Sequence, residues 1–503
     1  MTDTPDQVPP PKPPKVHSES LRGVLSEESI SSSVLTHLLG WIAAFSVGGL
    51  MLSLVLIGSH LATPEAGGLQ RIQMEQEMTG QMIYAAGPSG MNVDSSLLVP
   101  QISQLKDGSL VSRLSYAVLT SEVNTPAAGI EELDSIHEEK AAGTLELSPE
   151  EQTLLDDVSV LLFAVASGER ADELPEEREE SLRSTLGFFG ELLVAKSSGD
   201  QSTLDDLGAS SIRSMVALLI TAIWFISFFL GGIAALVILG IFAGIGKLKL
   251  KFSLAGSTGS VYMETFAIWI GMFFLLQIIM EGLTGLLLGG KLAIYIGPEF
   301  GLISSLIVMF VSLTALVWPR IRGISSATLL DDIGLGRVNV FKEILPGFVT
   351  YAMGLPLLVV GLMLSIVVAF VLNALFGEQP AASHPIQGLI GEGGWMTIVL
   401  VYLVACVAAP ITEEIMFRGV LYRYLREFSR AYGLILSIIF SMLISSFLFA
   451  AIHPQGLSFI PVLGALAVAF CIGREWRGSL VAPMVAHGLS NGVVMTLNVV
   501  LFS

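Results

Sequence analysis

Long apolar runs dominate this chain of 503 residues and restrict it to one class of fold. A helix needs about 20 apolar residues to cross a bilayer, and irregular backbone would leave unpaired polar groups there. The content of 52% hydrophobic and 14% charged residues, with a mean hydropathy of +0.72, is that of a membrane protein. We therefore predict an all-α polytopic membrane protein with about nine spans, at residues 38–61, 214–245, 261–289, 298–318, 345–376, 395–417, 432–452, 457–472 and 479–502.

The first apolar run follows a polar tail. Residues 1–37 are rich in Pro and Ser and lack apolar periodicity, which predicts a disordered cytoplasmic tail. The run from Leu38 to Leu61 has 24 residues, more than the roughly 7 to 15 of a signal-peptide core. We interpret it as a retained transmembrane anchor.

The segment between the first two spans carries the charge of the chain. Residues 62–213 contain 27 Asp and Glu and 9 Lys and Arg, a net charge of −18 that equals the charge of the whole chain. The segment has no long apolar run, so we predict an acidic domain outside the membrane. Its charge either recruits a basic partner or is an ordinary solvated surface.

Local signals predict that this domain is helical. Ser148 is suited to an N-cap, with Pro149 at the first helical position, Glu151 completing a capping box and Gly168 ending the helix. A second helical segment is expected after Pro175, because four apolar residues recur there at helical spacing: Leu182, Leu186, Phe189 and Leu193.

The positive-inside rule gives the orientation. With nine spans and a cytoplasmic N-terminus, every basic cluster of the short loops falls on the cytoplasmic side. Residues 62–213 and the C-terminus then lie outside the cell membrane. The clusters are Lys247 with Lys249 and Lys251, Arg320 with Arg322, Arg423 with Arg426 and Arg430, and Arg474 with Arg477.

A charged motif follows Pro410 inside the sixth apolar run. Pro410 cannot donate a backbone hydrogen bond, which predicts a broken or restarted helix. Glu414 and Arg418 are four residues apart, in the order that favours an ion pair on a helix. Glu413 points about 100° away and is free to hold a water or accept a proton. Alternatively, residues 413–430 are a charged helix end that emerges into the cytoplasm.

Two further motifs follow in the apolar C-terminal region. His453 lies four residues after Phe449, and a neutral imidazole there could share a water with Glu413. His487 and Asn491 are also four apart, and their donors could converge on one developing oxyanion. The alternatives are a loop-edge histidine before Pro454 and a polar contact between helices.

The three motifs together resemble those of the CPBP family of intramembrane proteases, which includes type II CAAX prenyl endopeptidases and the Abi-like bacteriocin-immunity proteins. The resemblance covers roughly residues 345–503, after additional spans in residues 214–344. It implies a glutamate-dependent peptidase in which Glu413 and His453 activate water, His487 and Asn491 stabilise the oxyanion, and Glu414 and Arg418 support the site.

The resemblance leaves the cofactor and the substrate open. No metal is required when Glu413 and His453 activate water, whereas a zinc ion would be held by Glu413, His453 and His487. The predicted partners are membrane lipid and a membrane-associated peptide, with or without a prenyl group, and not nucleic acid. A non-catalytic scaffold or immunity protein and a proton-coupled transporter are the alternative functions.

The depths of the two histidines pose a difficulty for this prediction. His487 lies about nine residues into its span and His453 at the far end of its own, so straight helices would hold them more than about 10 Å apart. A tilt, a kink near Pro410 or a partly buried loop must bring them together. Because hydrolysis needs water, we also expect a hydrophilic chamber.

Overall fold

The computed structural model describes residues 76–87, 102–171, 174–254, 256–288, 299–377, 394–453 and 455–502. Within these ranges every regular element is a helix. The prediction of an all-α polytopic membrane protein is thus confirmed for the described residues. The tail and the predicted anchor at residues 38–61 lie outside them.

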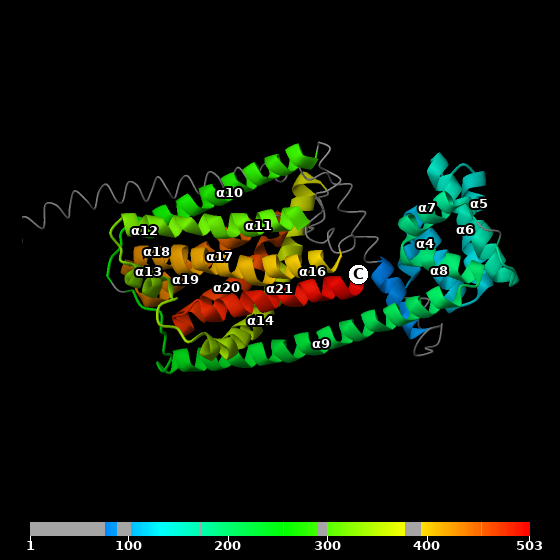
Figure 1. Ribbon diagram of the computed structural model, residues 1–503. Helices are drawn as coiled ribbons and strands as arrows, with labels where there is room; N and C mark the ends of the chain where they lie inside the picture. Colours follow the sequence, from blue (N-terminus) through cyan, green and yellow to red (C-terminus); the bar gives the residue numbers. More distant parts are fainter. Residues whose placement is uncertain are drawn as a thin grey trace, which may run out of the picture.

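A small helical domain stands apart from the main bundle, at the far end of one long helix (Figure 1). Its buried residues form one hydrophobic core, to which Leu114, Leu133 and Phe189 contribute. The elements are a helix at residues 76–86, η1 (Ser103–Asp107), α4 (Leu110–Val123), α5 (Pro126–Ala141), α6 (Pro149–Ser167), α7 (Glu176–Leu186) and α8 (Phe188–Ser198).

The punctuation of α6 is confirmed. The Ser148 hydroxyl accepts from the Glu151 backbone N–H, the Glu151 carboxylate accepts from the Ser148 N–H, and Gly168 closes the helix with φ of 71°. The second segment needs a correction, since Gly187 divides it into α7 and α8. The four apolar residues at helical spacing therefore occupy two helices that bury them in the same core.

One continuous helix joins this domain to the bundle. Helix α9 (Gln201–Gly244) has 44 residues, which corresponds to about 66 Å. Leu204 and Leu207 pack against the domain core, while Gly232 is buried against α14. The predicted boundary at residue 213 therefore lies inside a helix, which begins 13 residues before the span predicted from residue 214.

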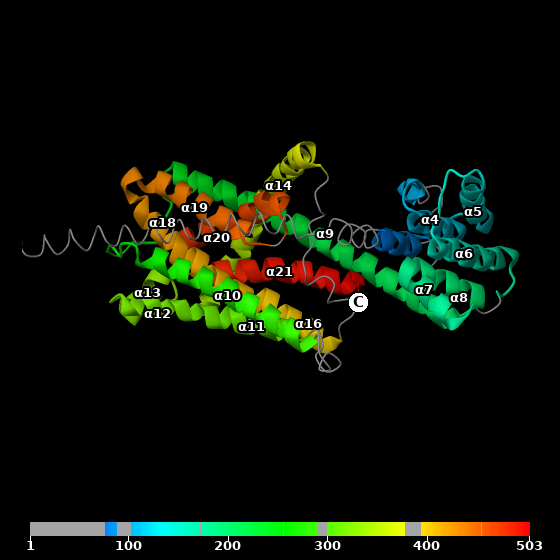
Figure 2. The same ribbon diagram turned by 90° about the horizontal axis from the view of Figure 1, so that it is seen from above.

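The remaining helices form the membrane bundle, seen from two sides in Figures 1 and 2. Seven helical stretches of the described residues are long and apolar enough to span a bilayer: Gln201–Gly244, Val261–Leu286, Glu299–Ile321, Val340–Phe376, Trp395–Phe428, Leu434–Ala451 and Leu457–Arg477. Helix α21 (Val481–Phe502), which carries His487, Asn491 and Asn498, is not among them. The count of nine spans stays a prediction.

The elements of the bundle are α10 (Val261–Leu288), α11 (Glu299–Ser312), η3 (Leu313–Leu316), α12 (Val317–Ile321), α13 (Ser326–Ile333), α14 (Val340–Phe376), α16 (Trp395–Tyr402), η4 (Leu403–Ala408), α17 (Ala409–Glu414), η5 (Ile415–Leu421), α18 (Tyr422–Phe428), η6 (Arg430–Tyr432), α19 (Leu434–Ala451), η7 (Leu457–Phe459), α20 (Ile460–Arg477) and α21. Segments η4 and η5 are π-helical.

The region around Pro410 differs from the prediction. From Trp395 to Phe428 the chain is one uninterrupted helical stretch, not a broken or restarted helix. The stretch absorbs Pro410 through the π turn of η4 just before it, and a second π turn, η5, follows Glu414. Such π turns occur frequently at functional sites.

Helix α14 packs closely against its neighbours because three of its glycines permit close helix contacts. Gly347, Gly354 and Gly361 recur every seven residues and thus share one helix face. A Cβ atom at Gly347 would meet Val485 of α21 at 2.5 Å, and one at Gly361 would meet the Pro461 carbonyl at 2.6 Å. Small residues at such positions are typical of membrane helix packing.

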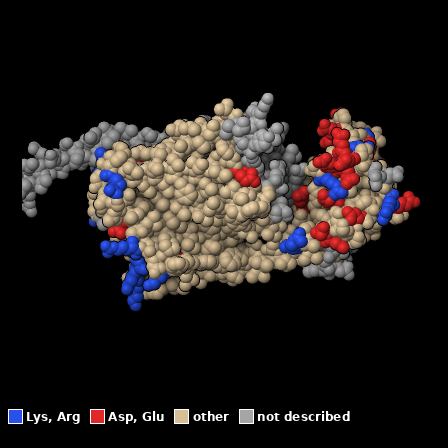
Figure 3. All heavy atoms as spheres, viewed as in Figure 1, with Lys and Arg blue, Asp and Glu red and all other residues tan. Residues whose placement is uncertain are grey.

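The visible charge is divided between the two ends of the molecule (Figure 3). Lys and Arg gather at the end of the bundle remote from the domain, whereas Asp and Glu outnumber Lys and Arg on the visible face of the domain. The flank between them shows few charges, as expected of a surface that contacts lipid.

Candidate functional site

The three motifs meet where three helical stretches of the bundle come together. Helix α17 ends with Glu413 and Glu414, and η5 carries Arg418. Phe449 lies near the end of α19 and His453 just beyond it, while α21 supplies His487 and Asn491. The residues are brought together from segments up to 78 positions apart (491 − 413).

Glu414 is the centre of a fully buried hydrogen-bonded group. Its Oε1 atom accepts from Arg418 Nη1 at 2.9 Å and from His487 Nδ1 at 2.9 Å. Arg418 also donates from Nη2 to the Ala467 carbonyl at 3.2 Å. The expected Glu414–Arg418 ion pair is present, with both side chains 0% exposed. The bond to His487 was not foreseen and gives Glu414 a second role.

Glu413 faces the two histidines. Its Oε2 atom lies 3.9 Å from His453 Nε2 and 3.8 Å from His487 Nε2. Both distances are too long for a direct hydrogen bond, but groups at this separation can bind one water molecule. The side chains of Glu413 and His453 are 17% and 18% exposed. The sequence-based separation of a paired Glu414 from an available Glu413 thus matches the geometry.

The partners of the two Nδ1 atoms bear on where the histidine rings carry their protons. His453 Nδ1 lies 2.6 Å from the Phe449 carbonyl, which can only accept, so Nδ1 carries a proton. His487 Nδ1 lies 2.9 Å from Glu414 Oε1, so a proton on this Nδ1 completes that hydrogen bond. A neutral imidazole then has a lone pair on Nε2, and both Nε2 atoms face Glu413.

Aromatic rings cover the charged group. The Arg418 guanidinium lies 4.4 Å from the centroid of Phe449 and 5.1 Å from that of Phe470. Phe470 also stacks on His487, with the ring centroids 5.1 Å apart and the planes 19° from parallel. Phe449 belongs to a motif, but Phe470 was missed because a phenylalanine in an apolar run carries no signal of its own.

Asn491 occupies a position that differs from the expected one. Its Nδ2 donates at 2.7 Å to the carbonyl of Ala405 in the π turn η4. In a π helix that carbonyl would accept from the residue five positions on, which is Pro410 and has no N–H. Asn491 therefore satisfies an acceptor that Pro410 leaves unpaired. One of its two amide hydrogens is used here, and the predicted convergence with His487 rests on the other.

The depth difficulty has a structural solution. The turn before α21 is buried, with Ser479, Leu480 and Val481 at most 8% exposed. The Leu480 N–H donates to the Gly334 carbonyl, and Arg474 Nη2 donates to the Asp332 carbonyl, so the α13–α14 connection covers this turn. His453 and His487 accordingly both come within 4 Å of the same Glu413 oxygen.

The alternative of a charged helix end emerging from the membrane does not fit. Arg418, Arg423 and Arg426 are buried within the bundle. Arg423 pairs with Asp332 and Glu427, and Arg426 with Glu475. Arg423 and Arg426, which were counted as loop charges for the orientation, are therefore buried in ion pairs within the protein. The sequence did not signal this, since their acidic partners lie on distant elements.

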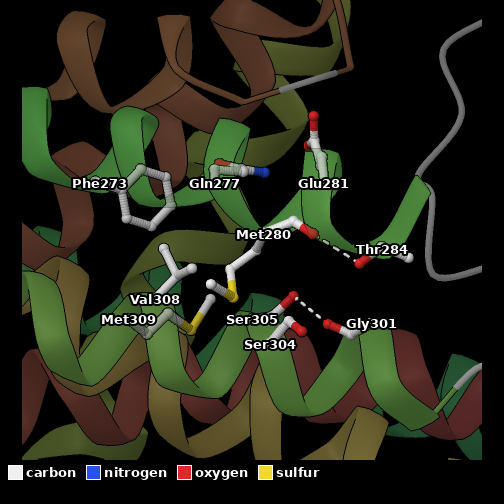
Figure 4. A pocket seen from close by; sticks show the side chains of 10 residues that line it. All are labelled: Phe273, Gln277, Met280, Glu281, Thr284, Gly301, Ser304, Ser305, Val308 and Met309. Carbon is white, nitrogen blue, oxygen red and sulfur yellow. Dashed lines mark hydrogen bonds between the residues drawn. The ribbon is translucent and has the colours of Figure 1, made fainter. Parts of the chain in front are cut away.

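A separate pocket lies between α10 and α11 and contains none of the motif residues. Its volume is about 310 Å³. Figure 4 shows Met280 and Met309 extending into the space between the two helices, with Ser305 bonded to the Gly301 carbonyl. The hydroxyl of Thr284 is likewise bonded within its own helix. The motif residues, not this pocket, carry the grouped charged and titratable side chains.

The set Glu413, His453 and His487 has suitable atoms for zinc, but its spacing is wide. Ligands about 2.1 Å from a tetrahedral ion lie about 3.4 Å apart, compared with 3.8 and 3.9 Å here. Among the described residues no three His, Cys, Asp or Glu side chains are placed to hold a metal ion.

Comparisons with known proteins agree with the motifs. Residues 395–493 match the family model of Rce1-like type II CAAX prenyl endopeptidases. The membrane-embedded CAAX protease MroQ of Staphylococcus aureus (strain USA300) is 29% identical over 129 residues, 26% of this chain and 50% of the relative. The chain thus spans about half the length of the curated relative it matches.

The match confirms the resemblance over the part of the chain that holds all three motifs. It begins at residue 395, whereas we expected it from about residue 345, so α14 lies outside it. No solved structure matches this chain.

Proposed function

We propose that this protein is an intramembrane endopeptidase that hydrolyses a peptide bond of a membrane-associated substrate with a water activated by Glu413 and His453. The observation that carries the proposal is the convergence of Glu413 Oε2 with two histidine Nε2 atoms at 3.8 and 3.9 Å. The similarity of residues 395–493 to CAAX endopeptidases supports the same reaction class.

The proposed reaction begins with a water molecule that donates one hydrogen bond to the Glu413 carboxylate and one to His453 Nε2. Glu413 takes one proton as general base while the water oxygen attacks the scissile carbonyl carbon. The tetrahedral intermediate then collapses, the C–N bond breaks, and the same proton passes from Glu413 to the leaving amine. No atom other than those of water and substrate is consumed.

His487 stabilises the oxyanion only in its doubly protonated form. Its Nδ1–H is committed to Glu414, so Nε2 can donate only when it also carries a proton. Two carboxylates, Glu413 and Glu414, lie next to the ring. The remaining N–H of Asn491 is the second proposed donor.

The substrate class and the surroundings belong to the same proposal. The bundle surface favours a substrate delivered from the lipid phase, with or without a prenyl chain. Residues 62–213 are proposed to lie outside the cell membrane, with the basic end of the bundle and the N-terminus in the cytoplasm. The acidic domain is a proposed docking region for a partner.

The test is cleavage of a membrane-tethered fluorogenic peptide by the purified full chain in liposomes. Glu413→Gln and His453→Ala should each lower kcat by about 10²- to 10⁴-fold. Glu281→Gln is the matched control, because Glu281 is an exposed glutamate in the α10 span and lies outside the motif group. Full activity in either site variant would refute the assignment.

A chelator distinguishes the two ways of activating water. We expect full activity after incubation with a strong chelator, because Glu413 and His453 suffice in the proposed reaction. Loss of activity that zinc restores would show instead that Glu413, His453 and His487 hold a metal that acts as Lewis acid. Absence of all cleavage in the wild-type protein would favour a non-catalytic scaffold.

A further inference from the structure

Phe470 is a fully buried ring of α20 that contacts two cationic or potentially cationic groups of the site. The guanidinium carbon of Arg418 lies 5.1 Å from its centroid. The imidazole of His487 stacks on it at 5.1 Å and 19°. No sequence motif contains Phe470, and its helix contributes no side chain to the motifs.

Both contacts involve groups whose position decides the geometry of the site. Arg418 holds Glu414, and Glu414 in turn orients His487. An aromatic face attracts a cation, and the attraction is larger when water is excluded, as it is around this buried group. The same ring also restricts rotation of the imidazole about its side-chain bonds, because the two planes are nearly parallel.

Phe470 is the ring that stacks on the face of the His487 imidazole. The groups that face His487 from α17 are Glu413 and Glu414. From α19 it meets Phe449 edge-on, at a centroid separation of 5.7 Å. The stacked contact therefore comes from α20 alone among the described residues.

We propose that Phe470 is a positioning residue, whose ring fixes His487 and Arg418 in the arrangement in which His487 acts on the substrate. The inference rests on the proposed peptidase function. It is specific about mechanism, because the ring would act through its π-electron face and not only through its volume.

Fluorination of one ring tests this mechanism. Phe470 is replaced in the full chain by 4-fluoro-, 3,5-difluoro- and 3,4,5-trifluorophenylalanine, which progressively weaken cation binding by the ring face with little change in size. The same series at Phe266 is the matched control. Phe266 is also 0% exposed and contacts the aromatic rings of Trp269 and Phe417, with no cation over its ring among the described residues.

The expected result is a stepwise loss of kcat along the series at position 470, reaching about tenfold or more, with KM changed less than about twofold. The melting temperature should fall in the same order at position 470. Neither quantity should follow fluorine number at position 266. A flat response at both positions, or equal responses, would overturn the proposal.

The two readouts separate this inference from the function on which it rests. If the wild-type protein cleaves no peptide, the proposed function fails, yet the melting series still decides whether Phe470 engages the cations. A flat melting series refutes the contact. A stepwise melting series with unchanged kcat in an active enzyme refutes the positioning role and leaves a purely structural one.

Discussion

Glu414 and His487, from two different helices, share a 2.9 Å hydrogen bond through the same carboxylate oxygen that binds Arg418. The oxygen therefore links an ion pair within one helix to the orientation of an imidazole on another. The other ring nitrogen of His487, Nε2, lies 3.8 Å from Glu413 Oε2. The supporting residue and the reacting group are parts of one buried unit.

Replacing Glu414 by Gln should lower both kcat and the melting temperature, with a larger loss of kcat than the loss of stability alone explains. The amide oxygen carries no negative charge, so it accepts more weakly from Arg418 and His487 and gives Arg418 no counter-charge, and we expect kcat to fall about 10- to 100-fold. The melting temperature should also fall, because Arg418 is left as an uncompensated buried charge.

A matched variant separates these two effects. Glu343 forms a bidentate ion pair with Arg477 elsewhere in the bundle. We expect Glu343→Gln to lower the melting temperature with kcat unchanged. A fall in kcat in proportion to the loss of stability in both variants would contradict a specific role of Glu414 in the reaction.

The link between Asn491 and Pro410 predicts a coupling that a double-mutant cycle can measure. Asn491→Ala leaves the Ala405 carbonyl without a donor and should cost about 1 to 3 kcal/mol of stability. Pro410→Ala restores a backbone N–H five residues from Ala405. In that background the cost of Asn491→Ala should shrink by about 1 kcal/mol.

The cycle is measured as thermal unfolding of the four purified proteins in one detergent. Additive effects would show that Asn491 does not replace the missing backbone donor. The activity of the Pro410→Ala protein is informative as well. If Asn491 is needed only for packing, the double variant should regain kcat together with stability. If Asn491 is an oxyanion donor, kcat should stay low even where stability recovers.

The sequence predicted contacts that depend on spacing along one helix. The capping box of Ser148 and Glu151 and the ion pair of Glu414 and Arg418 follow from local geometry, and both are present. Contacts between different helices could not be predicted from residue spacing. The bond from His487 to Glu414 depends on which helices are neighbours, and that information is not contained in residue spacing.

The limits of helices could not be read from the apolar runs alone. The apolar run from residue 214 does not show that the helix starts at Gln201, because its first part is amphipathic and packs on the domain core. Residue spacing also does not show that a connection distant in sequence buries the turn at Ser479. The π turns beside Pro410 have no residue signature beyond the proline itself.

The proposed orientation can be tested by labelling single cysteines on intact cells. Glu150 and Lys249 are exposed at opposite ends of the molecule, in the domain and after α9. A membrane-impermeant maleimide should label Glu150→Cys on intact cells and Lys249→Cys only after permeabilisation. The parent protein, whose Cys471 is buried and Cys406 half-buried, gives the background. The reverse pattern would invert the topology.

Adjacent glycines in α9 predict opposite effects of one substitution. A Cβ atom at Gly232 would lie 1.9 Å from the Ala352 carbonyl of α14, whereas one at Gly231 would meet no atom within 4 Å. Gly231→Ala should leave stability unchanged or raise it by up to about 1 kcal/mol, since alanine favours helix. Gly232→Ala forces α9 and α14 apart and should cost about 1 to 3 kcal/mol.

Thermal unfolding and hydrogen exchange of the two variants check this prediction. Because α9 is continuous with the domain, displacement at Gly232 should speed exchange of amides in the part of α14 that faces α9, while the domain core stays protected. Equal melting temperatures for both variants would mean that α9 does not pack on α14 at this point. The close contact is what fixes the domain relative to the helices that carry the site.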